Sequence, residues 1–239
     1  WMWISAILGM CTKFSEVVLA VHFKETNDKG ELVGGPMYYI KNGLKKHWHW
    51  LAYLFSALGV LTVFGTGNAT QVNTIITAID SALINYSIIS SDSTHIVNLI
   101  IGIIIMILIA LIMIGGIKRI GKVTEKLIPF MAILYIILAI GVIIANISNV
   151  PAVFKSIFEG AFSPASVTGG AVGSFFMSMK KGVSRGIFSN EAGLGTGSIA
   201  HACADTRKPV KQGFFGIFEV FVDTIVICTL TALVILCSG

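Results

Sequence analysis

Charge is scarce in this sequence of 239 residues: only 12% are Asp, Glu, Lys or Arg, against about 25% in an average soluble domain. So small a fraction of charged residues argues against a water-soluble enzyme. The sequence also contains no CxxC and no HExxH, and its four cysteines lie far apart, so neither a disulfide framework nor a zinc site is expected. What it has instead is hydrophobic residues, 55% of the total, which makes a lipid bilayer the expected solvent.

Six long apolar stretches are separated by shorter, more polar connectors. A helix needs about 20 apolar residues to cross a hydrocarbon core of about 30 Å, and each stretch is long enough. Runs of isoleucine would favour strands in water, but a segment in lipid must satisfy its own backbone hydrogen bonds, which a helix does. We therefore predict an all-α polytopic membrane protein. Its spans are expected at about residues 1–23, 51–79, 96–117, 127–147, 166–200 and 212–237.

Basic residues occur in every second connector. Connector 24–50 has five lysines, and connectors 118–126 and 201–211 are also basic, whereas 80–95 has no Lys or Arg and 148–165 has a single Lys. By the positive-inside rule, we expect the three basic connectors to face the cytoplasm and the other two to face outward. Because the positive charges are concentrated in these connectors, the net charge of +5 indicates a membrane surface as the partner rather than a nucleic acid. No nucleic-acid partner is expected.

Two connectors also contain helical patterns. Apolar residues recur at helical spacing behind Pro151, which predicts a short amphipathic helix on the outer face within 148–165. The glycines and proline of 34–40 predict a turn and then a helix on the cytoplasmic side. Because the sequence begins inside one apolar stretch and stops directly after another, we expect a single transmembrane domain, 1–239, truncated at both ends of a longer protein.

The second apolar stretch contains an unusual group of polar side chains. Within nine residues in the middle of this expected span lie Thr66, Asn68, Thr70, Gln71, Asn73 and Thr74. One interpretation is interhelical hydrogen bonding, each bond contributing about 0.6–2 kcal/mol, with neighbouring glycines allowing close packing. The other is the polar lining of a substrate cavity, and the presence of three amides favours this second interpretation.

The fifth stretch is rich in glycine, which predicts an interrupted helix. Eight glycines occur between residues 166 and 200, and the GxxxG pair of Gly169 and Gly173 is also typical of simple helix contact. A broken helix exposes backbone polar groups at membrane depth, where they are tolerated only inside protein or along a cavity. Because transporters place such breaks at their binding sites, we predict a discontinuous helix near 166–200 with a functional break near Gly169–Ser174.

A polar segment follows this predicted break. The segment 185–195, RGIFSNEAGLG, includes Arg185, Asn190 and Glu191, and its Ser189 with the following Ala and Gly indicates a helix cap. One interpretation is a cytoplasmic helix–turn closed by an Arg185–Glu191 pair. The other is a gate that breaks and re-forms during transport.

Two further pairs of charged residues lie within the expected spans, where each charge needs a partner or a cavity. Lys13 and Glu16 are three residues apart, and we expect them to pair with each other. Glu219 and Asp223 share one helix face, so we expect them to pair with Lys or Arg near the cytoplasmic end. A cation or proton site at these two carboxylates is the alternative.

Three motifs carry a family resemblance. GGPMYY at 34–39, FGTGN at 64–68 and RGIFSNEAGLG at 185–195 together resemble the alanine or glycine:cation symporter family, and the similarity extends over essentially the whole sequence. The resemblance implies an inverted-repeat amino-acid-transporter fold with two five-helix repeats, in which helices one and six are broken at the midplane. The six spans would be helices two to seven. The charge-based orientation agrees, because helix two of that fold runs inward.

The resemblance further implies a secondary active transporter in the cell membrane that imports alanine or glycine with sodium, or in some members with protons, by alternating access. The residues that would line the substrate site on helix three are Thr66, Gly67, Asn68 and Gln71. The residues that would form the break of helix six and an apolar wall beside it are Gly169, Gly170, Gly173, Ser174, Phe175, Phe176 and Met177. Such a wall would admit only a small side chain. Sodium is the implied coupling ion, its main site lies on helices absent from this sequence, and no other cofactor is implied.

Two other classes stay open at this point, a channel and a non-transporting membrane scaffold. A channel calls for pore-lining rings from identical subunits, and a scaffold does not need so many mid-span amides and glycines. An enzyme is not expected, because the sequence offers no His/Asp/Ser constellation. Saturable, cation-dependent counterflow would distinguish a transporter from both alternatives.

Overall fold

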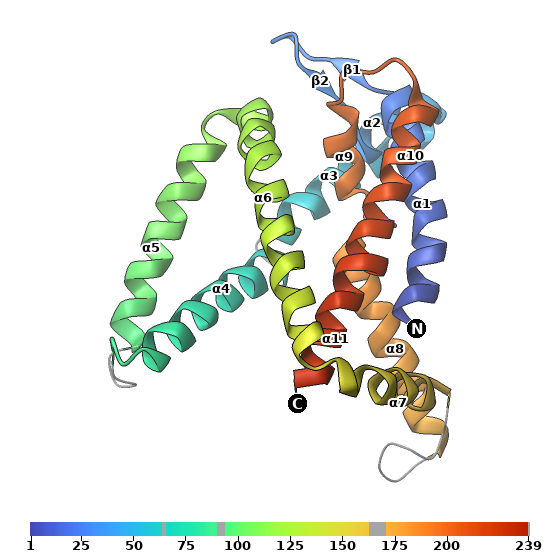
Figure 1. Ribbon diagram of the computed structural model, residues 1–239. Helices are drawn as coiled ribbons and strands as arrows, with labels where there is room; N and C mark the ends of the chain where they lie inside the picture. The colour runs from blue at the N-terminus through green and yellow to red at the C-terminus, as the bar shows by residue number, and fades with distance from the viewer. Residues whose placement is uncertain (64–65, 90–93, 163–170, 239) are drawn as a thin grey trace. The chain divides into compact units, whose positions relative to one another are not determined.

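The computed structural model describes residues 1–63, 66–89, 94–162 and 171–238, which form helices joined by short connectors and one small hairpin (Figure 1). The first elements are α1 (Met2–His22), β1 (Glu25–Thr26), β2 (Leu32–Val33), α2 (Pro36–Gly43), the 3₁₀ turn η1 (Lys46–Trp48), α3 (Trp50–Val63), α4 (Thr66–Asn85) and α5 (Thr94–Met113). There follow α6 (Gly116–Ala145), η3 (Ile147–Asn149), α7 (Val150–Phe162), α8 (Ala171–Asn190), α9 (Thr196–Ala202), α10 (Pro209–Val220), the π-helix η4 (Phe221–Ile227) and α11 (Cys228–Ser238).

The expected fold class, an all-α polytopic membrane protein, is confirmed. Among the described residues, four helical segments are long and apolar enough to cross a membrane: Met2–His22, Thr94–Met113, Arg119–Ala145 and Pro209–Ser238. The two helices expected in connectors are also present. α7 covers most of 148–165, and α2 begins at Pro36 directly after Gly35, whose φ of +117° makes the turn.

Two of the predicted spans consist of more than one helix. The stretch 51–79 corresponds to α3 and α4, and the stretch 166–200, expected to be a discontinuous helix, contains α8 and α9 with a turn between them. Connector 118–126 is not a loop, because α6 begins at Gly116 and runs through it. Lys and Arg are good helix formers, so a basic connector can continue a span as a helix. Of the predicted break near Gly169–Ser174, residues 169 and 170 lie outside the described residues, and 171–174 form the first turn of α8.

The chain forms two compact units. The first comprises Trp1–Phe55 and Tyr135–Gly239, and its centre is α1, which packs along α10 and also contacts α8, α9 and η4 (Figure 1). Small residues allow this close approach: Ala20 on α1 is fully buried, and Gly213 and Gly216 on α10 lie against α1 side chains. Asn149 donates through Nδ2 to the carbonyl of Cys237 at 3.1 Å and so ties the start of α7 to α11.

The second unit, Ser56–Leu134, contains α4 and α5, which contact each other. α5 is almost entirely apolar, yet none of its described side chains is buried within the protein. Exposed apolar surface of this extent is stable against lipid or other protein but not against water. The helix therefore presents the kind of surface that a membrane span requires.

Candidate functional site

The substrate-site residues predicted from the sequence occur in both units. Asn68 and Gln71 lie on α4 of the second unit and are exposed, and Thr66 and Gly67 form the first turn of that helix. Gly173, Ser174, Phe175 and Met177 lie on α8 of the first unit, while Gly169 and Gly170 fall outside the described residues. The described residues of each group therefore all lie within one unit.

The predicted apolar wall on α8 is part of an aromatic cluster. The ring of Phe175 meets that of Trp1 edge to face with 5.2 Å between centroids, and it also contacts Phe176 at 5.7 Å. Trp1 packs in turn on Phe162 at the end of α7 and donates through Nε1 to the carbonyl of Ala161 at 3.2 Å. These contacts hold Phe175 half-buried, whereas Met177 is exposed.

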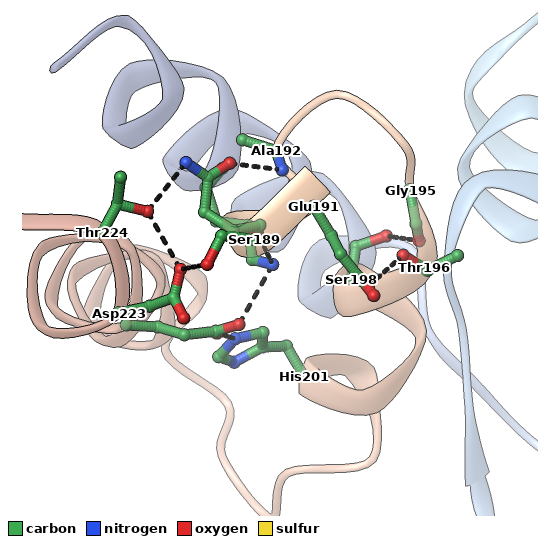
Figure 2. A network of polar contacts seen from close by, with 12 residues as sticks. Ser189, Glu191, Ala192, Gly195, Thr196, Ser198, His201, Asp223 and Thr224 are labelled. Carbon is green, nitrogen blue, oxygen red and sulfur yellow. Dashed lines mark hydrogen bonds and ion pairs between the residues drawn. The ribbon is translucent and has the colours of Figure 1, made fainter. Parts of the chain in front are cut away.

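The most connected polar site in the first unit surrounds the turn between α8 and α9 (Figure 2). Asn190, the last residue of α8 and one of the predicted gating residues, is buried there and uses its whole side chain. Its Oδ1 accepts from the backbone N–H of Ala192 at 3.0 Å, and its Nδ2 donates to Oγ1 of Thr224 at 3.1 Å. A single amide therefore shapes the turn and ties it to η4.

Lys13 of α1 reaches the same turn and is completely buried. Its Nζ donates to the backbone carbonyl of Asn190 at 3.2 Å and lies 3.1 Å from Oε1 of Glu219 on α10. The end of the side chain passes directly over Gly197 of α9, where an added Cβ would lie 2.2 Å from Nζ. Glycine at 197 thus makes room for the lysine.

The expected Lys13–Glu16 pair is replaced by this longer-range pair with Glu219. The carboxyl of Glu16 faces the backbone N–H groups of Gly193 and Gly195 in the turn, and its Oε2 is buried with no hydrogen-bond partner among the described residues. A lysine takes the partner that best compensates its burial, and across the helix interface Glu219 and a free carbonyl are both available. The expectation that Glu219 pairs with a basic residue is confirmed by the structure.

Glu219 has a second partner that the sequence did not indicate. Its Oε2 lies 2.7 Å from Nε2 of His201 on α9, and Nδ1 of the same ring lies 2.9 Å from Nε2 of Gln212 on α10. The chain Lys13–Glu219–His201–Gln212 therefore joins α1, α10 and α9. Figure 2 shows His201 at one end of the polar network.

The other acidic residue of the last span, Asp223, is held by hydroxyl groups. Its Oδ2 accepts from Oγ of Ser189 at 2.6 Å and from Oγ1 of Thr224 at 2.9 Å (Figure 2). Both Asp223 and Thr224 belong to the π-helix η4, and short π segments within α-helices are frequent at functional sites. The C-terminal end of α8 is thereby fixed to η4 through two side-chain contacts, one from Ser189 and one from Asn190.

The turn itself has an unusual backbone. Glu191, Gly193 and Gly195 all have positive φ, of +54°, +91° and +78°, and left-handed geometry is uncommon for a residue such as Glu. The carboxylate of Glu191 accepts from Oγ1 of Thr196 at 2.5 Å, so it does not use the predicted Arg185 as its partner. Among the described residues, no ion pair joins Arg185 to Glu191, and the helix–turn is closed by Thr196 instead.

Two of the three sequence motifs meet at this turn. An added Cβ at Gly195 would lie 2.5 Å from Cγ of Pro36, and one at Gly35 would lie 2.6 Å from Cγ1 of Ile199. Beside them Tyr39 is half-buried, and burial raises the pKa of its phenol, with the Glu16 carboxylate raising it further. The GGPMYY and RGIFSNEAGLG segments are therefore parts of one packed structure that connects α2, α1, α8 and α9.

The site offers charged and polar groups without a metal cluster: among the described residues, no group of three or more His, Cys, Asp or Glu side chains could hold a metal ion. Its ion pair around a buried lysine, its π-helix and its left-handed turn together suit a polar junction between helices. The sequence predicted polar roles for four residues of this site: Asn190, Glu191, Glu219 and Asp223. The prediction missed His201 and Thr224, for which the sequence contained no local signal beyond their polarity.

Comparisons with known proteins are consistent across the whole chain. A model of the sodium:alanine symporter family matches residues 1–239. An uncharacterized transporter of Haemophilus influenzae is 43% identical over 241 residues, which cover 100% of this chain and 50% of that protein. A probable sodium/glutamine symporter of Bacillus subtilis is 41% identical over 238 residues (100% and 46%), and a sodium/alanine symporter of Methanococcus maripaludis is 39% identical over 241 (100% and 50%).

The chain thus spans about half the length of the curated relatives it matches. The family match nevertheless leaves no part of the chain uncovered, and the helices observed here are those of a membrane-embedded protein. The chain belongs to the sodium:alanine symporter family of membrane transporters.

Proposed function

We propose that this chain forms about half of a secondary active transporter that imports a small neutral amino acid, alanine or glycine, together with sodium. Import would proceed by alternating access: the cation stabilises an outward-open state, the amino acid completes the site, and the helices then open it to the cytoplasm. A ligand can drive such a change only through its different affinities for the two states. Family membership and relatives with sodium symporter names support this proposal.

The structural observation that carries the proposal is the polar surface of α4. Asn68, Gln71 and Asn73 are exposed on this helix, although it belongs to a protein whose other exposed surface is largely apolar. Exposed amides are costly against lipid, so they must face a partner helix or a water-filled cavity. A substrate cavity uses such groups directly, since amides bind the amino and carboxylate groups of an amino acid.

The roles proposed for individual residues follow from the resemblance. On α4 the substrate would contact Thr66, Gly67, Asn68 and Gln71. The residues proposed from the fifth apolar stretch are Gly169, Gly170, Gly173, Ser174, Phe175 and Met177. An aromatic side chain fixed in a cluster, as Phe175 is by Trp1, limits the size of the substrate that fits beside it. This favours alanine or glycine over the glutamine named for the Bacillus subtilis relative.

The gate is proposed at the turn that follows α8. Asn190 and Glu191 lie at the start of this turn, and Arg185 lies on α8 before it. The contacts of Lys13 with Asn190 and Glu219 hold the turn against α1 and α10. By the positive-inside rule, the basic connectors favour a cytoplasmic position for the same end of these helices, and we propose the cell membrane as the location of the protein. The main sodium site would lie on helices outside this chain.

Uptake into liposomes that contain the full-length transporter tests the proposal. Labelled alanine and glycine would be supplied with an inward sodium gradient and, separately, with potassium and proton gradients. Gln71→Ala and Gly170→Leu test the two halves of the site. Ser81→Ala is the matched control on α4, because its hydroxyl donates only to the carbonyl of Thr77 at 2.8 Å on the same helix.

Sodium-dependent, saturable uptake that both site variants abolish and Ser81→Ala retains is the expected result. Uptake that is unchanged in both variants would move the substrate site onto other helices. Uptake that does not depend on a sodium, potassium or proton gradient would favour a channel. Absence of uptake of any small amino acid would favour a non-transporting scaffold.

A further inference from the structure

We propose that His201 is a proton-binding site, and that the proton it takes up fastens α9 to α10 and slows the transport cycle as the pH falls. The inference rests on the proposed transport function for its effect on uptake. The proton-binding site itself follows from the arrangement of side chains around the histidine ring, which can be tested without transport.

The surroundings of the ring satisfy both of its protonation states. In the neutral ring, a proton on Nε2 donates to Glu219 at 2.7 Å while Nδ1 accepts from the Gln212 amide at 2.9 Å. In the doubly protonated ring, Nδ1 also donates, and the Gln212 amide needs only to rotate by half a turn to present its oxygen. A terminal amide and a carboxylate together form a site in which a proton can enter or leave without stranding a buried polar group.

The elements packed around α9 bring several charged groups near the ring. Lys13 and Glu16 come from α1, Glu219 comes from α10, and β2 consists of Leu32 and Val33, which carry no charge. Of the other neighbouring acids, Asp223 accepts hydrogen bonds from Ser189 and Thr224, and the carboxyl of Glu16 faces the backbone of Gly193 and Gly195. The carboxylate that contacts the ring is therefore that of Glu219, which Lys13 contacts at its other oxygen.

Protonation changes the strength of the contact that holds α9. The neutral contact is a hydrogen bond, whereas the protonated ring and Glu219 form an ion pair beside Lys13. α9 is connected to α8 through three residues of left-handed geometry, Glu191, Gly193 and Gly195, so the turn is a suitable point of rotation. If α9 must leave α10 during the cycle, the proton stabilises the docked arrangement seen here and lowers the rate of undocking.

The first test measures uptake at different pH values in liposomes that contain the full-length transporter. The pH is kept equal on both sides, so that protonation of the protein is separated from any proton gradient, and the sodium gradient is held constant. Because Glu219 is 45% exposed, the ion pair should slow wild-type uptake only about two- to fivefold between about pH 8 and pH 5.5. His201→Gln, which keeps a donor for Glu219, should remove this dependence, whereas the exposed His47→Gln should keep the wild-type profile.

The second test needs no transport. Cys203 is the residue that follows α9. In a full-length variant in which every other cysteine is replaced by alanine, the rate at which Cys203 is alkylated reports the undocking of this helix. The alkylation rate of Cys203 is measured in His201→Gln and in wild type, and the ratio of the two is taken. The ionisation of the thiol changes with pH in the same way in both proteins, so it does not affect this ratio. We expect a ratio near one at high pH that rises about two- to fivefold at low pH.

A ratio that stays constant with pH overturns the proton-binding site, whatever the uptake shows. Identical uptake profiles in wild type and His201→Gln also overturn its effect on the cycle. Absence of uptake in the wild-type protein would contradict the proposed function alone, because the alkylation ratio would still decide whether His201 binds the proton.

Discussion

Nζ of Lys13 lies 3.1 Å from Oε1 of Glu219, although Glu16 follows Lys13 by less than one helical turn. The lysine is fully buried, so its charge is sustained by this carboxylate and by the carbonyl of Asn190. Three parts of the chain meet at one ammonium group: α1, the end of α8 and α10. The stability of the proposed gate should therefore depend on this side chain more than on any surface ion pair.

Lys13→Met tests that dependence. The substitution keeps the length of the side chain but leaves Glu219 and the Asn190 carbonyl without their donor. Loss of one partner from a fully buried pair costs about 3–5 kcal/mol, and since Glu219 is 45% exposed and keeps His201, we expect about 1–3 kcal/mol here. Thermal unfolding of the purified full-length transporter in detergent would measure the loss.

Lys155→Met is the matched control. Lys155 pairs with Glu159 one turn further along α7 at 3.8 Å, and both side chains are mostly exposed. Such a pair contributes about 0.3–0.5 kcal/mol at most. Equal destabilisation by the two substitutions would contradict the importance assigned to the buried Lys13.

Gly197→Ala should disturb the same pair from the opposite side. Its Cβ would lie 2.2 Å from Nζ and 2.9 Å from Cε of Lys13, so the flexible end of the lysine has to move away from Glu219. We expect a loss of stability similar to that of Lys13→Met, and little additional loss when both are combined, because neighbouring substitutions are not additive. Gly141→Ala on α6 has open space around the new methyl group and should be neutral or slightly stabilising. Additive losses from Gly197→Ala and Lys13→Met would show that the two residues do not act on one contact.

Much of the helical architecture was predictable because it is local. Continuous apolar stretches set α1 and α5 to within a few residues, and the periodicity behind Pro151 predicted α7. The start of α6 was placed too late, because a run of basic residues was treated as a connector although such residues also form helices well. Local patterns define which segments are helical, but charge alone does not define where a helix begins.

The polar site was predictable only in part because its contacts are long-range. A charged residue inside a span predicts that a partner exists, as it did for Glu219, but it does not say which one. Lys13 had a carboxylate close by in the sequence and uses a distant one. His201 had no sequence signal at all, since its role depends on α9 folding back against α10. The substrate-site residues stay predictions, because no contact described here tests them.

Thr224→Val tests the junction between α8 and η4. Valine has nearly the same shape, but it removes the acceptor for Asn190 and one of the two hydroxyl donors to Asp223. Since Thr224 is fully buried, the unsatisfied amide should cost about 1–3 kcal/mol, measured by thermal unfolding as above. Thr77→Val on α4 is the control, because that hydroxyl is exposed and donates only to the carbonyl of Asn73. A neutral effect of Thr224→Val would exclude a structural role for the hydroxyl bridge.

The thiol of Cys203 should react slowly with water-soluble alkylating reagents. Burial raises its pKa, Lys24 lowers it in part and Glu31 raises it again, and the net direction is upward. A raised pKa means that less thiolate is present at any pH below it, so the alkylation rate should stay below that of a small free thiol near pH 8 and still rise where the free thiol has levelled off. Glu31→Gln removes one cause of the increase and should accelerate alkylation at pH 7.5. Asp28→Asn removes a carboxylate of the same connector that does not act on Cys203 and should leave the rate unchanged. Equal acceleration by both variants would assign the effect to the net charge of the connector rather than to the contact with Glu31.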